Sequence, residues 1–166
     1  NNSLFYVDIE GHALIRLCLD PIHEDVWDVG ERIGTVAPTT DGSLLCAGDS
    51  GIFSFHLQGT EKKLLVDPEA HKRPDNRFND GMCDPSGRFW AGTISTTKQT
   101  GDASLYMLDH EGCLHKKIHH VTNSNGICWN ATASLMYYID TPTKKVLAYP
   151  FDNTTGNLGA PTELID

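Results

Sequence analysis

The chain has 166 residues, a length typical of one domain. Hydrophobic residues make up 39% of it and charged residues 21%, which excludes a wholly disordered chain. The 13 Lys and Arg against 22 Asp and Glu give a net charge of −9, so neither nucleic acid nor an anionic membrane surface is expected as a partner. No apolar run approaches the roughly 20 residues of a membrane helix.

In chain order, short runs rich in β-branched and aromatic residues alternate with turn residues, and this pattern predicts strands. The predicted pairs of strands fall at residues 4–7 and 13–17, 42–48 and 51–55, 87–92 and 104–108, and 134–140 and 146–149. Only residues 67–72 have a helical composition, and Pro68 and Pro74 bracket them. The sequence therefore predicts an all-β protein.

These pairs repeat along the chain. Equivalent residues of the first runs are Phe5, Leu45, Phe89 and Met136, spaced 40, 44 and 47 residues apart. A period of about 40–50 residues with several short strands per unit is typical of a β-propeller, in which neighbouring blades bury each other's faces.

A further strand precedes three of the pairs, at residues 35–38, 79–83 and 124–129, and would be the innermost strand of its blade. The first repeat has no such strand. We therefore expect residues 1–166 to form one incomplete propeller domain of about three and a half to four blades, at about 1–33 (lacking the inner strand), 34–76, 77–122 and 123–166.

Polar residues begin two of the expected innermost strands, where a propeller opens its central channel. These residues are Arg77, Asn79 and Asp80 on one strand and Asn125 on the other. A carboxamide oxygen suits Ca²⁺, Mg²⁺ or Mn²⁺ and can also orient a substrate hydroxyl. The alternative is turn chemistry, because Asp-Gly and Asn-Gly are common turn dipeptides.

The five cysteines are an odd number with no C-x-x-C pair and no zinc-type spacing, which predicts reduced, mostly buried thiols and a cytoplasmic location. Buried packing is expected for Cys83 and Cys128 in particular, since both lie on predicted inner strands. The histidines, His23 among them, are interpreted as scattered surface residues.

Three segments together resemble a known family. Residues 77–93 read R-F-N-D-G-M-C-D-P-S-G-R-F-W-A-G-T, residues 124–129 read S-N-G-I-C-W, and residues 138–140 read Y-I-D. These segments are similar to the motifs of the SMP-30/gluconolactonase/regucalcin family, also called luciferin-regenerating-enzyme-like. The resemblance implies a six-bladed propeller that hydrolyses sugar lactones at one divalent metal ion (Ca, Zn, Mn or Mg) in its central channel.

The resemblance also assigns roles by position. Asn125 matches a metal ligand, and Arg77 and Asn79 match residues that contact the substrate. Asp80 lies beside them, either as a catalytic residue or as an Asp bonded to the channel backbone. The other two expected ligands, a Glu and an Asp, would lie before Asn1 and beyond Asp166. An acidic substrate contact of vertebrate members falls at about Thr97, which is not acidic.

The sequence thus predicts a metal-dependent, gluconolactonase-like lactonase, with a non-catalytic calcium-binding or scaffold propeller as the alternative. The chain alone is expected to have little activity, since most of the expected ligands lie outside it. It is also expected to self-associate through the exposed strands and apolar faces of unclosed blades.

Overall fold

The computed structural model describes residues 2–165, and strands dominate it. Contacts between Cα atoms divide the chain into two compact units, Asn1–Phe78 and Asn79–Asp166. The two helices found within residues 2–165 are three-residue 3₁₀ turns, η1 (Ala70–Lys72) and η2 (Thr141–Thr143), so no helix in that range could span a membrane. The region with helical composition, residues 67–72, therefore forms a single 3₁₀ turn.

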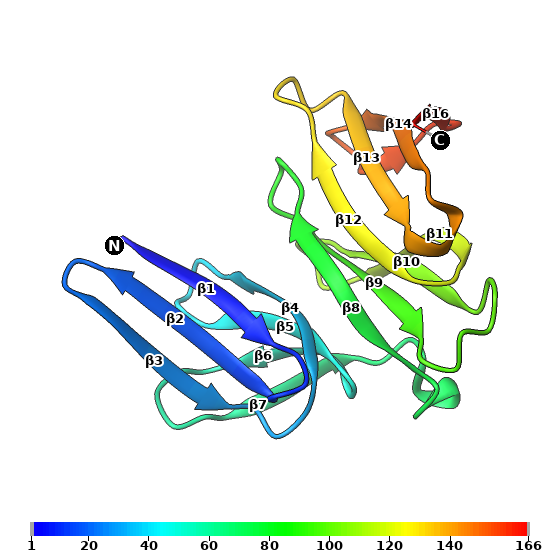
Figure 1. Cartoon of the computed structure of the whole chain (residues 1–166). Helices are drawn as coiled ribbons and strands as arrows, with labels where there is room; N and C mark the ends of the chain where they lie inside the picture. The colour runs from blue at the N-terminus through cyan, green and yellow to red at the C-terminus, as the bar shows by residue number, and fades with distance from the viewer. Residues whose placement is uncertain (1, 166) are drawn as a thin grey trace. The chain divides into compact units, whose positions relative to one another are not determined.

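The first unit contains two antiparallel sheets (Figure 1). One sheet consists of β1 (Ser3–Asp8), β2 (Ala13–Leu19) and β3 (Ile22–Asp28), in that order. The other consists of β4 (Ile33–Pro38), β5 (Leu44–Gly48), β6 (Gly51–Phe55) and β7 (Lys62–Val66). A core of buried apolar side chains from both sheets joins them, with these members: Leu14, Val29, Ile33, Leu44, Cys46, Phe53 and Phe55.

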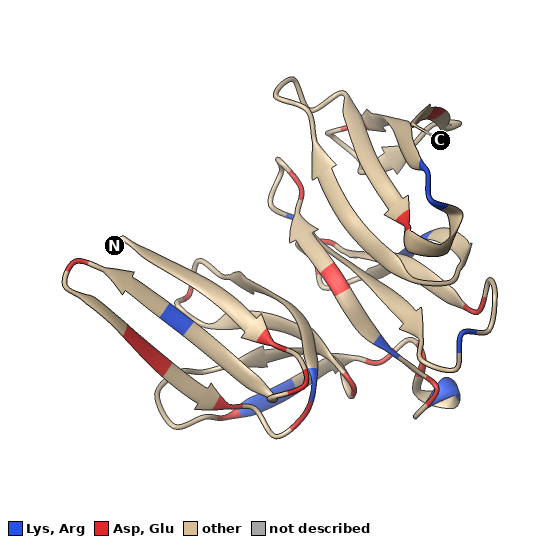
Figure 2. Ribbon diagram, in the orientation of Figure 1, with Lys and Arg blue, Asp and Glu red and all other residues tan. Residues whose placement is uncertain are grey.

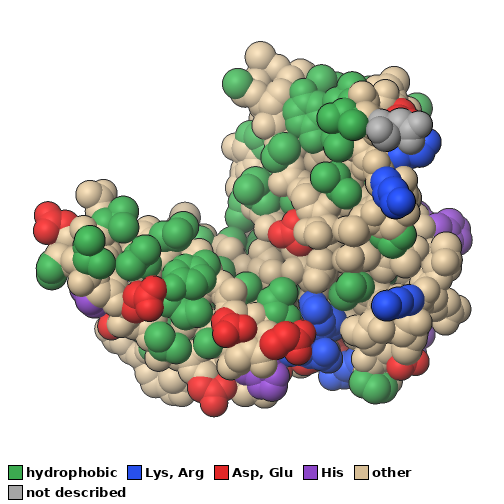
Figure 3. Space-filling model, in the orientation of Figure 1, with side chains coloured by type: hydrophobic (Ala, Val, Ile, Leu, Met, Phe, Trp, Pro, Cys, Tyr) green, Lys and Arg blue, Asp and Glu red, His purple; other side chains and the backbone are tan. Residues whose placement is uncertain are grey.

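The other face of the first sheet carries exposed apolar side chains. Leu4 is 56% exposed and Val26 is 62% exposed. Leu4 pairs with Leu17, and Val26 pairs with Ile15, so this face runs across all three strands. Apolar side chains gather on the visible surface over this sheet in Figure 3.

Two further antiparallel sheets follow. The third has the order β11-β10-β9-β8, with β8 (Asn76–Cys83), β9 (Phe89–Ser95), β10 (Ala103–Leu108) and β11 (Leu114–Val121). The fourth contains β12 (Ser124–Trp129), β13 (Leu135–Asp140), β14 (Val146–Asp152), β15 (Asn157–Leu158) and β16 (Thr162–Ile165). In the second unit, Trp90, Leu105, Met136 and Tyr138 are at most 2% exposed and form the centre of the core.

The predicted innermost strands are present as β4, β8 and β12, and each lies at one edge of its sheet. One expectation on β12 is wrong. Cys128 is exposed rather than buried, and Cys83 is only partly buried. The pairing of β12 with β13 shifts by one residue between Asn125 and Ile127, and Ile127 takes the buried position. The adjacent Cys128 then points to the opposite face of the strand.

Candidate functional site on strands β8 and β12

Asn79 ties β8 to the segment that leads into β12. Its Nδ2 donates to Asn123 Oδ1 at 3.1 Å and to the backbone oxygen of Ser124 at 2.8 Å. Asn79 is only partly exposed. Both donor hydrogens of the amide are thereby used within the protein, which fixes the orientation of the carboxamide between the two strands.

Asp80 makes a second link between the same two strands. Its Oδ2 accepts the backbone N–H of Gly126 at 2.6 Å, and its Oδ1 accepts the N–H of Gly81 at 2.8 Å. The bond to Gly126 lies at the register shift of β12, where Gly126 has a φ of +71°. A left-handed backbone at this position favours glycine, so the S-N-G triplet and Asp80 together build a β-bulge.

Asn125 lies on this bulge. It is exposed, and its carboxamide forms no hydrogen bond with any residue in the range 2–165. The bulge re-aims the side chain that precedes it, as bulges next to binding sites commonly do. The carboxamide oxygen of Asn125 is therefore a neutral, hard ligand atom on an exposed side chain of β12. The hydrogen bond from Gly126 to Asp80 fixes the backbone next to it.

Gly92 explains how β12 can come so close to β9. A Cβ atom built on Gly92 would overlap the Oγ and Cβ of Ser124. The glycine of the W-A-G-T segment is thus required for packing against the S-N-G segment, which places the backbone of β12 beside the third sheet.

Arg77 belongs to the first unit. Its side chain is 11% exposed, its Nη1 donates to the backbone oxygen of Phe78 at 2.9 Å, and its Nη2 lies 3.8 Å from Glu10 Oε1. Burial, followed by the positive charge of Arg32, lowers the pKa of Arg77 below its usual value. It remains a guanidinium at neutral pH, because the ordinary pKa is above 12.

The later residues of the motif at 77–93 have a structural role. Asp84 and Arg88 are almost fully buried, and Asp84 Oδ2 accepts Arg88 Nε at 2.6 Å and Trp90 Nε1 at 2.9 Å. Arg88 also donates to the backbone oxygens of Asn153 and Thr154, at 2.8 and 3.0 Å. The buried pair of Asp84 and Arg88 thus fastens the third sheet to the fourth, while the P-S-G turn between them is exposed.

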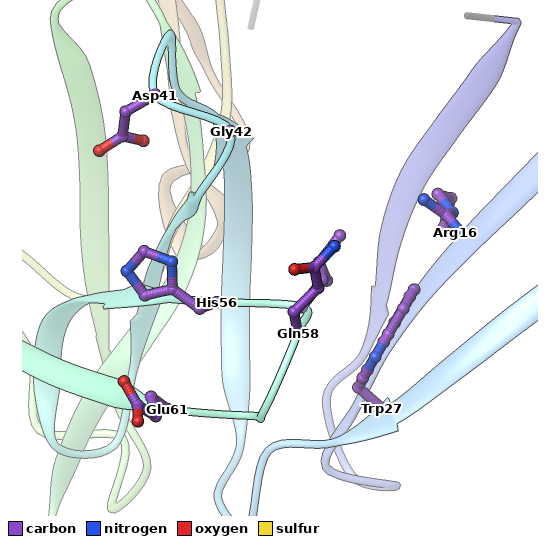
Figure 4. A pocket seen from close by; sticks show the side chains of 8 residues that line it. Arg16, Trp27, Asp41, Gly42, His56, Gln58 and Glu61 are labelled. Carbon is purple, nitrogen blue, oxygen red and sulfur yellow. The ribbon is translucent and has the colours of Figure 1, made fainter.

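The first unit holds a separate pocket of about 660 Å³. Figure 4 shows Arg16 and Trp27 on one side of it and His56, Glu61 and Asp41 on the other. Its lining includes none of the residues Arg77, Asn79, Asp80 and Asn125. The polar pocket of the first unit is therefore distinct from the residues that the sequence singles out.

The donor set around Asn125 fits a divalent cation only in part. Asn125 offers one oxygen, whereas both oxygens of Asp80 already accept backbone N–H groups. Within residues 2–165, the one group of three His, Cys, Asp or Glu side chains with converging ligand atoms lies elsewhere, on β2 and β3. Asn125 thus suits one ligand position of a hard cation, and its neighbours here do not complete the set.

Comparison with known proteins places the chain in a family. The model of the SMP-30/gluconolactonase/LRE-like region matches residues 1–166. YvrE of Bacillus subtilis, provisionally named a sugar lactone lactonase, is 33% identical over 97% of this chain and 55% of its own length. Regucalcin of Danio rerio is 32% identical over 95% of this chain and 54% of its own. The chain thus spans about half the length of these relatives.

Solved structures agree with the fold. A calcium-binding regucalcin from Agrobacterium tumefaciens superposes with a TM-score of 0.90 at 26% identity, over 98% of this chain and 55% of that one. A luciferin-regenerating enzyme superposes with a TM-score of 0.91 at 22% identity, over 98% of this chain and 56% of that one. The all-β, partial-propeller fold expected from the repeat is confirmed, and the chain belongs to the SMP-30/gluconolactonase/LRE-like family.

Proposed function

We propose that the protein to which this chain belongs hydrolyses sugar lactones with the help of one divalent metal ion. The family match supports the reaction class. The observation that supports the site is the exposed carboxamide of Asn125, which lies on the β-bulge that Asp80 fixes through its bond with Gly126. In the reaction, water adds to the lactone carbonyl and the ring C–O bond breaks, which yields a hydroxycarboxylate and a proton. A bound metal would polarise the carbonyl and stabilise the developing oxyanion.

Asn125 would supply one ligand to the metal, through its carboxamide oxygen. Arg77 and Asn79 would contact the substrate, Arg77 as a fixed cation and Asn79 as a carboxamide whose orientation its hydrogen bonds fix. We assign Asp80 a positioning role, because both of its carboxylate oxygens accept backbone N–H groups. Further ligands and the general base would come from residues outside this chain.

A non-catalytic, calcium-binding propeller is the second candidate. The observation in its favour is the solved relative from Agrobacterium tumefaciens, which is described as a calcium-binding protein. An odd number of cysteines supports a cytoplasmic location for either candidate.

The test uses the full-length gene product that contains this chain. Proton release from several aldonolactones is followed with Ca²⁺, Zn²⁺, Mn²⁺ or Mg²⁺ added, against the spontaneous rate. We expect metal-dependent hydrolysis that Asn125→Ala reduces, whereas the control Asn157→Ala, an exposed carboxamide on β15, leaves it unchanged. Calcium binding without hydrolysis of any lactone would favour the second candidate.

A second readout separates the assigned roles. Asn125→Ala should weaken metal binding measured by calorimetry, whereas Arg77→Ala should raise KM more than it lowers metal affinity. An unchanged metal affinity in Asn125→Ala would remove Asn125 from the ligand set.

A further inference from the structure

The β2–β3 hairpin of the first unit gathers three metal-binding side chains that do not belong to the site described above. Cys18 and His23 are directly paired across the hairpin, and Asp25 follows two residues after His23. Residues paired across a sheet and residues two apart on a strand share a face, so all three project from the same side. One ligand atom of each side chain lies within 4.8 Å of the other two.

The His23 ring is already oriented as metal-bound histidines are. Its Nδ1 lies 3.0 Å from the backbone oxygen of Pro21, in the turn of the hairpin. Its Nε2 faces Asp25, 3.6 Å from Oδ2. Metal-ligating histidines commonly donate one ring N–H to a carbonyl, which fixes the tautomer and leaves the other nitrogen for the metal.

Arg16 orients the carboxylate in the same way. Its Nε and Nη2 donate to Oδ2 of Asp25 at 3.0 and 2.7 Å, and its guanidinium lies 5.5 Å from the centre of the Trp27 ring. Figure 2 shows the basic position on β2 opposite the acidic stretch of β3.

We propose that Cys18, His23 and Asp25 form a zinc site, with water as the fourth ligand. Thiolate, imidazole and carboxylate together suit Zn²⁺, whereas Ca²⁺ and Mg²⁺ prefer oxygen ligands alone. Bond lengths of about 2.0–2.3 Å in a tetrahedron place ligand atoms about 3.3–3.8 Å apart. The side chains of His23 and Asp25 are 49% and 35% exposed, so small rotations about their side-chain bonds can close this gap.

The second unit contains a matched control. Asp109, Cys113 and His115 are the same three residue types within seven positions, and His115 Nε2 lies 2.6 Å from Asp109 Oδ2. Cys113 is exposed. Among residues 2–165, however, only the Cys18 group brings all three ligand atoms together.

The first experiment adds Co²⁺, a spectroscopic substitute for Zn²⁺, to the 166-residue chain. We expect one equivalent to bind with a thiolate-to-cobalt charge-transfer band that Zn²⁺ removes. Cys18→Ser should abolish the band, and Cys113→Ser should keep it. Absence of the band in the unmodified chain, or its persistence in Cys18→Ser, would overturn the proposal.

The second experiment measures Zn²⁺ affinity by competition with a chromophoric chelator. His23→Ala and Asp25→Asn should each weaken binding by at least about 10-fold, since even groups outside the ligand shell cost about 10–100-fold. His115→Ala and Asp109→Asn should leave the affinity unchanged, and equal losses in both sets would contradict the site. Far-UV circular dichroism of the metal-free variants confirms folding, and Zn²⁺ should raise the Tm of the unmodified chain but not of Cys18→Ser.

Discussion

The carboxylate of Asp80 on β8 accepts the backbone N–H of Gly126 on β12 at 2.6 Å, 46 residues further along the chain. This bond holds the β-bulge from which Asn125 points outward. The same pair of strands is also joined by the amide of Asn79. The R-F-N-D-G and S-N-G segments therefore depend on each other, because the polar side chains of the first segment fix the backbone of the second.

Asp80→Asn should destabilise the fold. A hydrogen bond to a charged acceptor contributes about 1.5–3 kcal/mol, and Asn can retain one weaker bond, so we expect a loss of about 1–2 kcal/mol in the free energy of unfolding. Urea denaturation measures it. Asp20→Asn, at an exposed position, is the control and should change the midpoint little. Equal midpoints for Asp80→Asn and the unmodified chain would show that the bond to Gly126 does not hold the bulge.

Arg88→Met should destabilise the fold more than Asp80→Asn does. It leaves Asp84 buried without its cation, and breaking a buried ion pair by removing one partner costs about 3–5 kcal/mol. Loss of the bonds to Asn153 and Thr154 also frees the turn after β14. Thermal unfolding of the variant and of the double variant Arg88→Met/Asp84→Asn separates the two effects, because Asn removes the buried charge and keeps an acceptor oxygen for Trp90 Nε1. The double variant should recover part of the stability, and no recovery would argue against an unpaired Asp84 as the cause.

The turn at Asp41 should give the stability a dependence on acid pH. Hydrogen bonds from Thr39, and then from Ser43, lower the pKa of Asp41 to about 2 from 3.8. A lowered pKa in the folded state stabilises the protein above the unfolded value, and this stabilisation is lost as the pH falls from about 4 through about 2. Asp41→Asn should therefore be less stable than the unmodified chain at pH 6, with the difference shrinking by pH 2.5. Chemical denaturation at both pH values measures it, and a constant difference would refute the assignment.

The apolar face of the first sheet should drive self-association of the isolated chain. Leu4 and Val26 are both more than half exposed on that face. Analytical ultracentrifugation at increasing concentration should show association, and Leu4→Lys with Val26→Lys should reduce it. The control substitutions Gln58→Lys and Glu111→Lys, at two exposed polar positions, should not reduce the association. A monodisperse monomer at all concentrations would contradict the prediction.

The strands, the repeat and the family could be predicted from the sequence, because they depend on local patterns. Short apolar runs bounded by turn residues predict β9 and β10 without knowledge of their neighbours. The residues at the ends of β8 and β12 could be singled out for the same reason, since their position in the repeat is a local property.

The partners of these residues were decided only by the tertiary structure. From the sequence, Asp80 could be a catalytic residue or an Asp bonded to the channel backbone, and its bond to Gly126 depends on a bulge that shifts the register of β12 by one residue. The same shift leaves Cys128 exposed where burial was predicted. Cys18 and His23 have no recognised zinc spacing, yet the register of β2 with β3 makes them direct neighbours. A one-residue change of register moves a side chain to the opposite face of a sheet, so composition and spacing alone could not decide which side chains meet.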